Sequence, residues 1–440
     1  MCAFRNTVRD SKITIPAGIR GQKPGKPAGR GFDRGHHCTR DIIASAAAVL
    51  TAVCWILAGC GAGASAGGYG QGSVTQSGGI GTAGSGPQPQ PVTRQSFYFD
   101  TVCGITVYDM EDMSEENAGK AIESAFSLCG DYESLLSKTK EGTDIWNINH
   151  AGGEPVVCNP ETVKVIQMGI DYGDLSGGAF DITVGKAEDL WDFHSDEPKV
   201  PDEAALQEAV SHVNYKGIRI DEDSGSVTMV DPEAEIDLGG IAKGYIADRV
   251  RENLKENGVT SAIISLGGNI ECVGGKPVTG GISRSAADAD GSTNEQQEEG
   301  PSAEAQDGGQ VQDTGYFTIG IETPYADMSS IVGSTPVNDG TVVTSGVYER
   351  YFTVDGKEYH HILDVRTGYP ADSDVLGVSI KSSGGHSADC DALATICLID
   401  GSAKGKTLID SMDGYEALFI LRDSSIIKTD GFEFAPAEGR

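Results

Sequence analysis

The spacing of apolar residues along the chain predicts helices alternating with strands. Between residues 115 and 136, apolar side chains recur at Ala118, Ile122, Ala125 and Phe126, as in an amphipathic helix. The same criterion predicts further helices at residues 162–174, 202–212, 241–257 and 386–399. Apolar and β-branched runs predict strands at residues 97–107, 217–220, 226–230, 262–266, 316–321, 351–354, 375–380 and 418–421, of which 217–220 and 226–230 form a hairpin. This alternation predicts one α+β (mixed α/β) body over residues 96–436.

Two segments lack any such pattern. Residues 60–95 are rich in Gly, Ser, Ala and Gln, a composition that buries too little apolar surface to fold and predicts a flexible tether. Residues 283–315 hold eight acidic residues, one basic residue and no apolar residue other than Ala and Val. We expect this stretch to be a disordered acidic insertion within the body.

The N-terminal segment has the pattern of an export signal. Residues 1–40 contain nine basic and two acidic residues, and the uncharged apolar run 42–59 follows. That run has the length of a long signal-peptide core or of a membrane span of roughly 20 residues. It ends in Leu57-Ala58-Gly59-Cys60, which resembles the lipobox of bacterial lipoproteins, whose cysteine is lipidated and becomes the mature N-terminus. We therefore expect residues 1–59 to be a lipoprotein signal peptide and the protein to be exported and lipid-anchored to the outer face of the cell membrane, with an uncleaved signal anchor as the alternative.

The charge of the chain excludes one broad class of function. The 440 residues carry 33 Lys+Arg against 65 Asp+Glu, a net charge of −32. Removing residues 1–59 takes away nine basic and three acidic residues and leaves 24 positive against 62 negative charges, or −38. So acidic a body lacks the basic surface that general nucleic-acid binding needs.

The cysteines that would remain in the folded body are scattered. They have no CxxC or Cys/His spacing that would indicate a metal site. Disulfides and single buried thiols both remain open, because a domain of this size needs no covalent crosslinks. These residues are Cys103, Cys129, Cys158, Cys272, Cys390 and Cys397.

A glycine-rich turn before a predicted helix could approach a phosphate. Residues 237–245 read DLGGIAKGY, with Lys243 in the first helical turn. Glycines there let backbone amides reach an anion, and the helix N-terminus adds positive potential. The spacing matches neither GxxxxGK[ST] nor GxGxxG, so a tight helix start without a ligand is the alternative. The turn SLGGN at residues 265–269 allows the same two interpretations.

Two further patterns carry polar chemistry. Asp391 and Thr395 lie one helical turn apart in an apolar helix, which suits a hard cation with oxygen ligands; a capping Asp with a core Thr is the alternative. His360 and His361 end a predicted strand, where a histidine could act as a general base. Adjacent strand residues point to opposite sides, so only one of the two can face a site.

These motifs occur in one order that resembles the ApbE family, the FAD:protein FMN transferases. The resemblance covers about residues 97–425. Members of this family are typically exported lipoproteins. The matching segments are SGGAFDITVG (176–185) with Leu190-Trp191, DLGGIAKGYIAD (237–248), SLGGN (265–269), IGIETP (319–324), TSGVYERY (344–351), HHILDVRTGYP (360–370) and DCDALAT (389–395).

The resemblance implies a Mg2+-dependent transferase with an ApbE-like fold of mixed sheets flanked by helices. It would cleave the diphosphate of FAD, release AMP and attach FMN through a phosphoester to a Thr or Ser hydroxyl of an exported or membrane flavoprotein. The family's metal ligands fall on the carbonyl of Gly240 and the side chains of Asp391 and Thr395. Its flavin contacts fall on Ala179, Phe180, Asp181, Asp237, Lys243 and Ile362. His361 matches the family's histidine before Ile-Ile-Asp and is our expected base, with Asp391 as the other catalytic residue.

The chain departs from the family pattern at positions expected to contact the flavin ring. Many members have a stacking aromatic residue where this chain has Thr139, and Phe99 matches another flavin contact only loosely. Two alternative functions remain: a hydrolase that converts FAD to FMN and AMP, and a flavin-binding lipoprotein without turnover. The predicted metal ligands Asp391 and Thr395, together with His361, argue against a protein that only binds flavin, because such a protein has no need of a metal.

Overall fold

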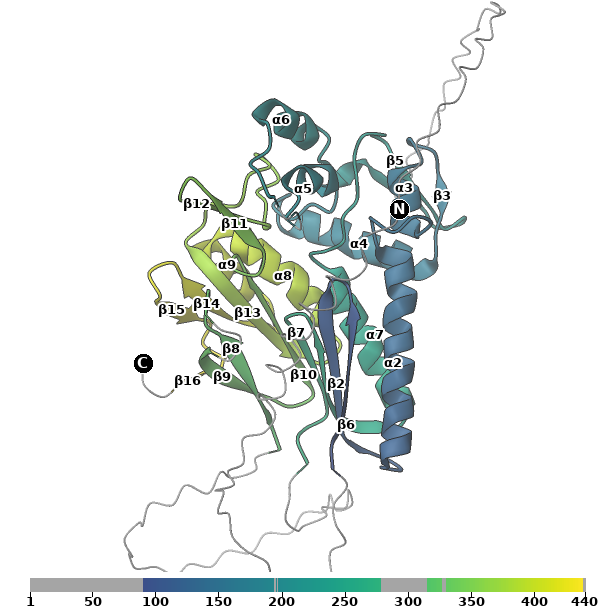
Figure 1. Cartoon of the computed structure of the whole chain (residues 1–440), viewed down its shortest axis with the longest axis vertical. Coiled ribbons are helices and arrows are strands. Elements are labelled where there is room, and N and C mark those ends of the chain that lie inside the picture. The colour runs from purple at the N-terminus through teal and green to yellow at the C-terminus, as the bar shows by residue number, and fades with distance from the viewer. Residues whose placement is uncertain (1–89, 194, 196, 278–314, 327–329, 438–440) are drawn as a thin grey trace, which may run out of the picture. The chain divides into compact units, whose positions relative to one another are not determined.

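The computed structural model describes residues 90–437 except 194, 196, 278–314 and 327–329 (Figure 1). The predicted signal peptide at residues 1–59, Cys60, the tether up to residue 89 and nearly all of the acidic insertion lie outside the described residues. Within the described part, no helix is both long enough and apolar enough to span a bilayer.

An eight-stranded antiparallel sheet forms the centre of the body. Its strand order is β1-β2-β6-β7-β10-β13-β14-β15. The bounds are Val92–Tyr98 (β1), Thr101–Met110 (β2), Val259–Leu266 (β6), Asn269–Val273 (β7), Gly340–Gly346 (β10), Val375–Ser383 (β13), Glu416–Leu421 (β14) and Ile426–Lys428 (β15). Neighbouring residues of one strand enter different apolar clusters: Val343 of β10 joins the main core, and Val342 joins a second cluster with Phe317. Both faces of the sheet are therefore covered.

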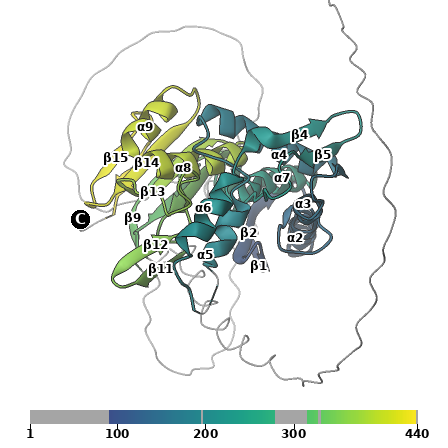
Figure 2. The ribbon, with the colours of Figure 1, turned by 90° about the horizontal axis from the view of Figure 1, so that it is seen from above.

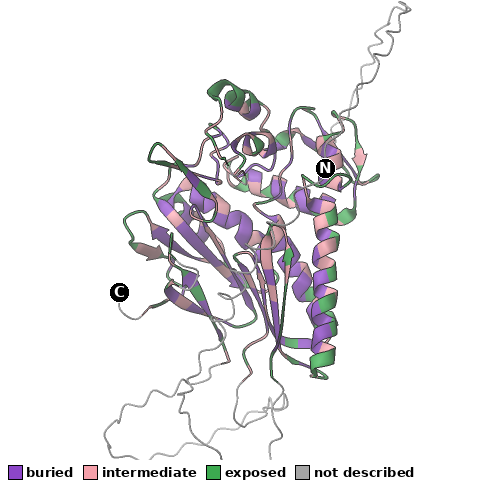
Figure 3. Ribbon diagram, viewed as in Figure 1, coloured by how far each residue is buried: buried purple, intermediate pink, exposed green. Residues whose placement is uncertain are grey.

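Helices pack on the main-core face. The helices α2 (Glu115–Leu136), α7 (Ala242–Glu256) and α8 (Ser387–Asp400) contribute buried residues to that core (Figures 1 and 2). Figure 3 shows that buried residues gather along the central strands and α8. The other helices are α3 (Asp144–Asn149), α4 (Pro160–Leu175), α5 (Gly185–Trp191), α6 (Glu203–Ser211) and α9 (Ser402–Asp410), with a short 3-10 helix at Tyr215–Gly217.

Three small sheets complete the described structure. The first pairs β3 (Val156–Val157), β5 (Ser226–Met229) and β4 (Ile218–Asp221), which contains the predicted hairpin. The second pairs β16 (Ala435–Pro436), β9 (Ile331–Val337) and β8 (Phe317–Glu322). The third is the hairpin of β11 (Tyr351–Val354) and β12 (Lys357–His360).

The predicted strand at residues 97–107 is wrong in detail, because the chain turns back at its start. Phe99 and Asp100 both have φ of 55° and join β1 to β2, with Tyr98 opposite Thr101. Two residues with positive φ form the tight turn that suits the twist of a hairpin. β1 therefore begins at Val92, inside the segment assigned to the tether, and its polar residues are tolerated because it is an edge strand.

The six cysteines of the body are unpaired and buried. Of the two alternatives left open by the sequence, single buried thiols are thus confirmed.

Helices α7 and α8 touch at Gly244 and cap each other. A methyl group at Gly244 would lie 2.2 Å from the Ser387 carbonyl oxygen, so glycine is needed for this approach. Asp391 of α8 accepts the N–H of Gly244 at 3.0 Å. Asp248 of α7 accepts the N–H groups of Ser387 and Ala388 at 2.8 and 3.0 Å. These amides belong to the first turns of helices, where no intrahelical partner exists, so the two helix starts are fixed to each other.

We expect Gly244→Ala to lower the free energy of unfolding by about 3 kcal/mol, because the added methyl group collides with backbone that cannot move aside. Gly119→Ala in α2 is the matched control, since nothing lies within 4 Å of its methyl group. That variant should be neutral or more stable by about 0.5–1 kcal/mol. Urea unfolding of both variants measures the difference, and equal effects would contradict the close contact.

Candidate active site

The three predicted metal-ligand positions meet where α7 and α8 begin. Asp391 and Thr395 lie one turn apart on α8, as predicted. A methyl group at Gly240 would lie 3.4 Å from Thr395 Oγ1 and 2.9 Å from Phe180 Cε2. The turn before α7 is therefore adjacent to the Thr395 hydroxyl and to one predicted flavin contact.

A carboxylate, a hydroxyl and a backbone carbonyl form a donor set that suits a hard divalent cation. Asp391 is only 2 % exposed, and its Oδ2 is already bonded to the Gly244 amide, which leaves Oδ1 for another partner. No group of three His, Cys, Asp or Glu residues with metal-binding geometry occurs among the described residues. A site with one carboxylate fits Mg2+, which commonly completes its coordination with water and substrate phosphates.

Hydrogen bonds within residues 237–243 and to Ile182 hold the turn that carries Gly240. Asp237 Oδ1 accepts the Gly239 N–H at 2.6 Å, and the Asp237 N–H bonds to the Ile182 carbonyl at 2.7 Å. Lys243 Nζ, in the first turn of α7, donates to the Gly239 carbonyl at 3.4 Å. Asp237 and Lys243 therefore both brace this turn, in addition to their predicted contacts with flavin.

The Asp181 carboxylate accepts hydrogen bonds from other groups of the protein. Its Oδ1 accepts the N–H and hydroxyl of Thr183 at 2.8 and 2.6 Å, and its Oδ2 accepts the Tyr215 N–H at 3.0 Å. Both oxygens thus organise the loop after Phe180. The flavin contact predicted for Asp181 did not specify an atom, and the structure shows that both oxygens of its carboxylate already accept hydrogen bonds within the protein.

The two histidines have different surroundings, and only His360 belongs to the strand β12. His360, the last residue of β12, is 3 % exposed, and its Nε2 lies 3.2 Å from the Ala371 carbonyl oxygen. His361 donates its backbone N–H to the Arg350 carbonyl at 3.1 Å, and its ring Nδ1 lies 3.2 Å from the same oxygen. That contact assigns the proton to Nδ1 and leaves Nε2 as the acceptor. The neighbouring Ile362 is buried and accepts the Ala371 N–H at 2.9 Å.

The charges around His361 keep its ring neutral. Burial, followed by the positive charges of Arg350 and Lys243, lowers the pKa of His361 to about 3. Lys243, in the first turn of α7, is one of the charges that act on His361. This electrostatic effect supports the predicted grouping of His361 with the turn before α7.

An aromatic cluster anchors the hairpin that ends at the histidines. The Trp191 ring of α5 lies 6.1 Å from Phe352 and 5.3 Å from Tyr359, and Trp191 Nε1 donates to the Gly368 carbonyl at 2.7 Å. Trp191 is completely buried. This packing fixes the position of His361 through β11 and β12.

Sequence reasoning missed two charged residues at the site. Glu349 accepts the Gly346 N–H at 2.9 Å, and its residue keeps solvent-exposed surface. Surrounding protein atoms raise the pKa of Glu349 to about 7, and the positive charge of Lys243 opposes this rise. Lys138 follows α2 and lies 3.1 Å from Asp237 Oδ2. Glu349 stands in the TSGVYERY motif, which was the available signal. Lys138 precedes Thr139, the position matched to the family's stacking residue, but no pattern assigned a role to the lysine itself.

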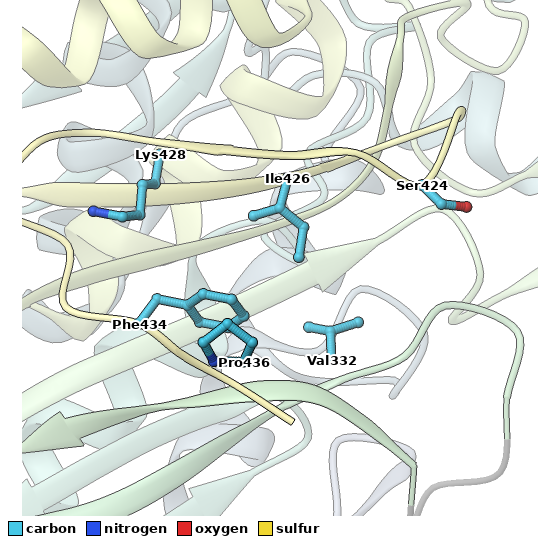
Figure 4. Close-up of a pocket in the computed structure, with 6 residues that line it drawn as sticks. All are labelled: Val332, Ser424, Ile426, Lys428, Phe434 and Pro436. Atoms are coloured by element: carbon cyan, nitrogen blue, oxygen red, sulfur yellow. The ribbon is translucent and has the colours of Figure 1, made fainter. Parts of the chain in front are cut away.

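An apolar groove of about 400 Å³ lies apart from these residues (Figure 4). It contains none of the predicted site residues. Its lining consists of Val332, Ser424, Ile426, Lys428, Phe434 and Pro436.

The chain is similar in sequence and fold to known proteins. A protein named FAD:protein FMN transferase from Klebsiella pneumoniae (strain 342) is 32% identical over 303 residues, 69% of this chain and 82% of that protein. One of the same name from Treponema pallidum (strain Nichols) is 32% identical over 345 residues, 77% and 87% of the two chains. The crystal structure of the ApbE protein from Thermotoga maritima has a TM-score of 0.63 at 26% identity, over 78% of this chain and 97% of that one.

The flavin transferase ApbE from Vibrio cholerae, at 21% identity, shares the fold with a TM-score of 0.59 over 77% of this chain and 96% of that one. The ApbE family pattern itself matches residues 99–298 and 302–419, more than half of the sequence. The protein described here therefore belongs to the ApbE family.

Proposed function

We propose that this protein is a Mg2+-dependent FAD:protein FMN transferase. It would cleave FAD, release AMP and attach FMN to a Thr or Ser hydroxyl of an exported or membrane flavoprotein. Two observations carry the proposal: Asp391 and Thr395 of α8 offer oxygen donors next to the turn before α7, and His361 after β12 has a neutral imidazole. The names of the relatives from Klebsiella pneumoniae and Treponema pallidum support the reaction class.

The reaction breaks one phosphoanhydride bond and forms one phosphoester. The acceptor hydroxyl oxygen attacks the phosphorus on the FMN side, the bond to the AMP phosphate breaks, and AMP departs with the bonding electron pair. The hydroxyl proton passes to His361 Nε2, the ring nitrogen left free by the contact of Nδ1 with the Arg350 carbonyl. Burial and nearby positive charges lower the pKa of His361, and the negative diphosphate of bound FAD would counter this effect and make the ring a better proton acceptor.

The remaining residues bind and orient FAD. Mg2+ held by Asp391, Thr395 and the Gly240 carbonyl would offset the negative charge that grows on the leaving phosphate. Lys243 adds a positive charge beside the same turn. The buried ring of Phe180 packs next to Gly240 and supports the turn from the side of the core.

The place of action follows from the N-terminal sequence. The export signal at residues 1–59 and the lipobox cysteine Cys60 support an enzyme that is anchored by lipid outside the cytoplasm, where its acceptor flavoprotein would be exported or membrane-bound. Metabolic labelling with a fatty acid tests this anchor, because Cys60→Ala should abolish the labelling.

We expect the purified full chain with FAD and Mg2+ to make an exported apo-flavoprotein fluorescent by covalent FMN, with one AMP released per FMN attached. Asp391→Ala should abolish the fluorescent band because the cation loses its carboxylate. His361→Ala should slow transfer by about 10²-fold or more while FAD binding survives. In-gel fluorescence and chromatography of AMP measure the two products.

The possible outcomes separate the alternatives. AMP release that does not depend on the acceptor would show a hydrolase. FAD that stays bound and intact for hours with Mg2+ would contradict both enzymes. If His361→Ala loses FAD binding, the assignment of His361 as the base is wrong.

The mutual capping of α7 and α8 predicts an effect on Mg2+ dependence. Asp248→Ala removes the acceptor for the Ser387 and Ala388 amides and should cost about 1–2 kcal/mol of stability. Because α8 carries Asp391 and Thr395, the Mg2+ concentration for half-maximal transfer should rise. A Mg2+ titration of transfer at saturating FAD measures this change.

Asp202→Ala is the matched control for that experiment. Asp202 caps α6 by accepting the Ala204 and Ala205 amides at 3.0 and 3.1 Å, and α6 carries no predicted site residue. The variant should lose similar stability and keep the original Mg2+ dependence. The same Mg2+ shift in both variants would show that general destabilisation, rather than the position of α8, is responsible.

A further inference from the structure

Lys138 joins three segments around the candidate site. It follows the C-terminal end of α2, and only 14 % of its side chain is exposed. Its Nζ lies 3.1 Å from Asp237 Oδ2, 2.7 Å from Asp189 Oδ1 and 3.5 Å from Glu188 Oε2. It also donates to the Gly185 carbonyl at 3.2 Å. One ammonium group thus links α2, the first turns of α5 and the turn before α7.

Around Lys138, three acidic side chains surround one ammonium group: Asp237, Asp189 and Glu188. Burial disfavours the ionised Asp237, yet Lys138 holds the pKa of this carboxyl below its usual value. Burial and the nearby Asp237 raise the pKa of Glu188 to about 8, which reduces its negative charge at neutral pH. Lys138 is therefore the cation that balances Asp237 and the half-exposed Asp189, and its removal would leave two carboxylates facing each other.

Asp237 carries this charge pairing into the site. While its Oδ2 contacts Lys138, its Oδ1 accepts the Gly239 N–H at 2.6 Å. The Gly239 carbonyl in turn accepts from Lys243, and the next residue, Gly240, adjoins Thr395. A displaced or protonated Asp237 would therefore alter the turn that offers its backbone to the phosphates.

We propose that Lys138 is a positioning residue for FAD: its pairing with Asp237 fixes the 237–240 turn and cancels negative charge beside the binding place of the anionic dinucleotide. The inference rests on the proposed function, since it requires FAD to bind at this turn. Lys138 acts through Asp237 and need not touch the substrate.

The test compares Lys138→Met, Lys138→Arg and Lys186→Met in the full chain. Lys186 also lies on the α5 side and pairs with Glu233 at 2.9 Å, but it makes no contact with Asp237, so it is the matched control. FAD affinity is measured by fluorescence titration in EDTA, where no turnover occurs. Lys138→Met should weaken binding about tenfold or more, Lys138→Arg should restore most of it, and Lys186→Met should bind as the original protein does.

Two readouts separate positioning by charge from a merely structural role. The affinity deficit of Lys138→Met should shrink at high salt, because added ions screen the repulsion between the carboxylates and FAD. In the transfer assay, KM for FAD should rise while kcat changes little. A deficit that is unchanged by salt, or a loss confined to kcat, would overturn the inference.

A double variant keeps the test decisive if Lys138→Met folds poorly. Asp189→Asn removes one negative charge at a position whose side chain is 58 % exposed, so Lys138→Met/Asp189→Asn should fold better and bind FAD more tightly than Lys138→Met. No gain in affinity would count against the charge argument. If the original protein binds FAD without transferring FMN, the proposed function fails while the binding comparison still tests Lys138. Unchanged affinity in Lys138→Met refutes this inference alone.

Discussion

The direct contact of α7 with α8 is the constraint on which the site depends. Two helix starts normally repel a close neighbour, since each exposes unpaired amides with the same partial charge. Here Asp391 and Asp248 place a carboxylate on each start, and Gly244 removes the side chain that would separate the helices. The same Asp391 is the expected cation ligand. Folding thus brings the Gly240 turn, Lys243 and Thr395 together before any ligand binds.

The site counters the negative charge of the protein locally. The chain has a net charge of −32, yet Lys243 and Arg350 lie near His361, and Lys138 pairs with Asp237. An anionic dinucleotide meets these few cations at short range, while the distant carboxylates are screened by salt. The overall charge therefore says little about the substrate. Whether an anionic dinucleotide binds depends on the charged groups near the Gly240 turn.

Periodicity and motifs predicted the parts of the structure whose cause is local. The helix at residues 115–136 needs only its own apolar stripe and the Ser114 cap, and the observed α2 matches it. The β1–β2 turn was missed because positive φ at Phe99 and Asp100 is set by strand pairing, not by a glycine. Similarly, the internal use of Asp181 and the pairing of Lys138 with Asp237 arise between segments far apart in the sequence, where no single-segment pattern exists. The family motifs predicted that the Gly240 turn would lie beside Asp391 and Thr395, but not how the hydrogen bonds of these residues would be shared.

Burial protects the six thiols of the body only while the protein is folded. Burial raises the pKa of Cys103 to about 11 and of Cys397 to about 12, so neither forms the thiolate that reacts with oxidants. The unfolded chain has no such protection, and its six thiols can join in mismatched bridges that prevent refolding. For an enzyme proposed to work outside the cytoplasm, each unfolding event then risks being irreversible. Its persistence is governed by how rarely it opens, a kinetic property, more than by the free energy between its folded and unfolded states.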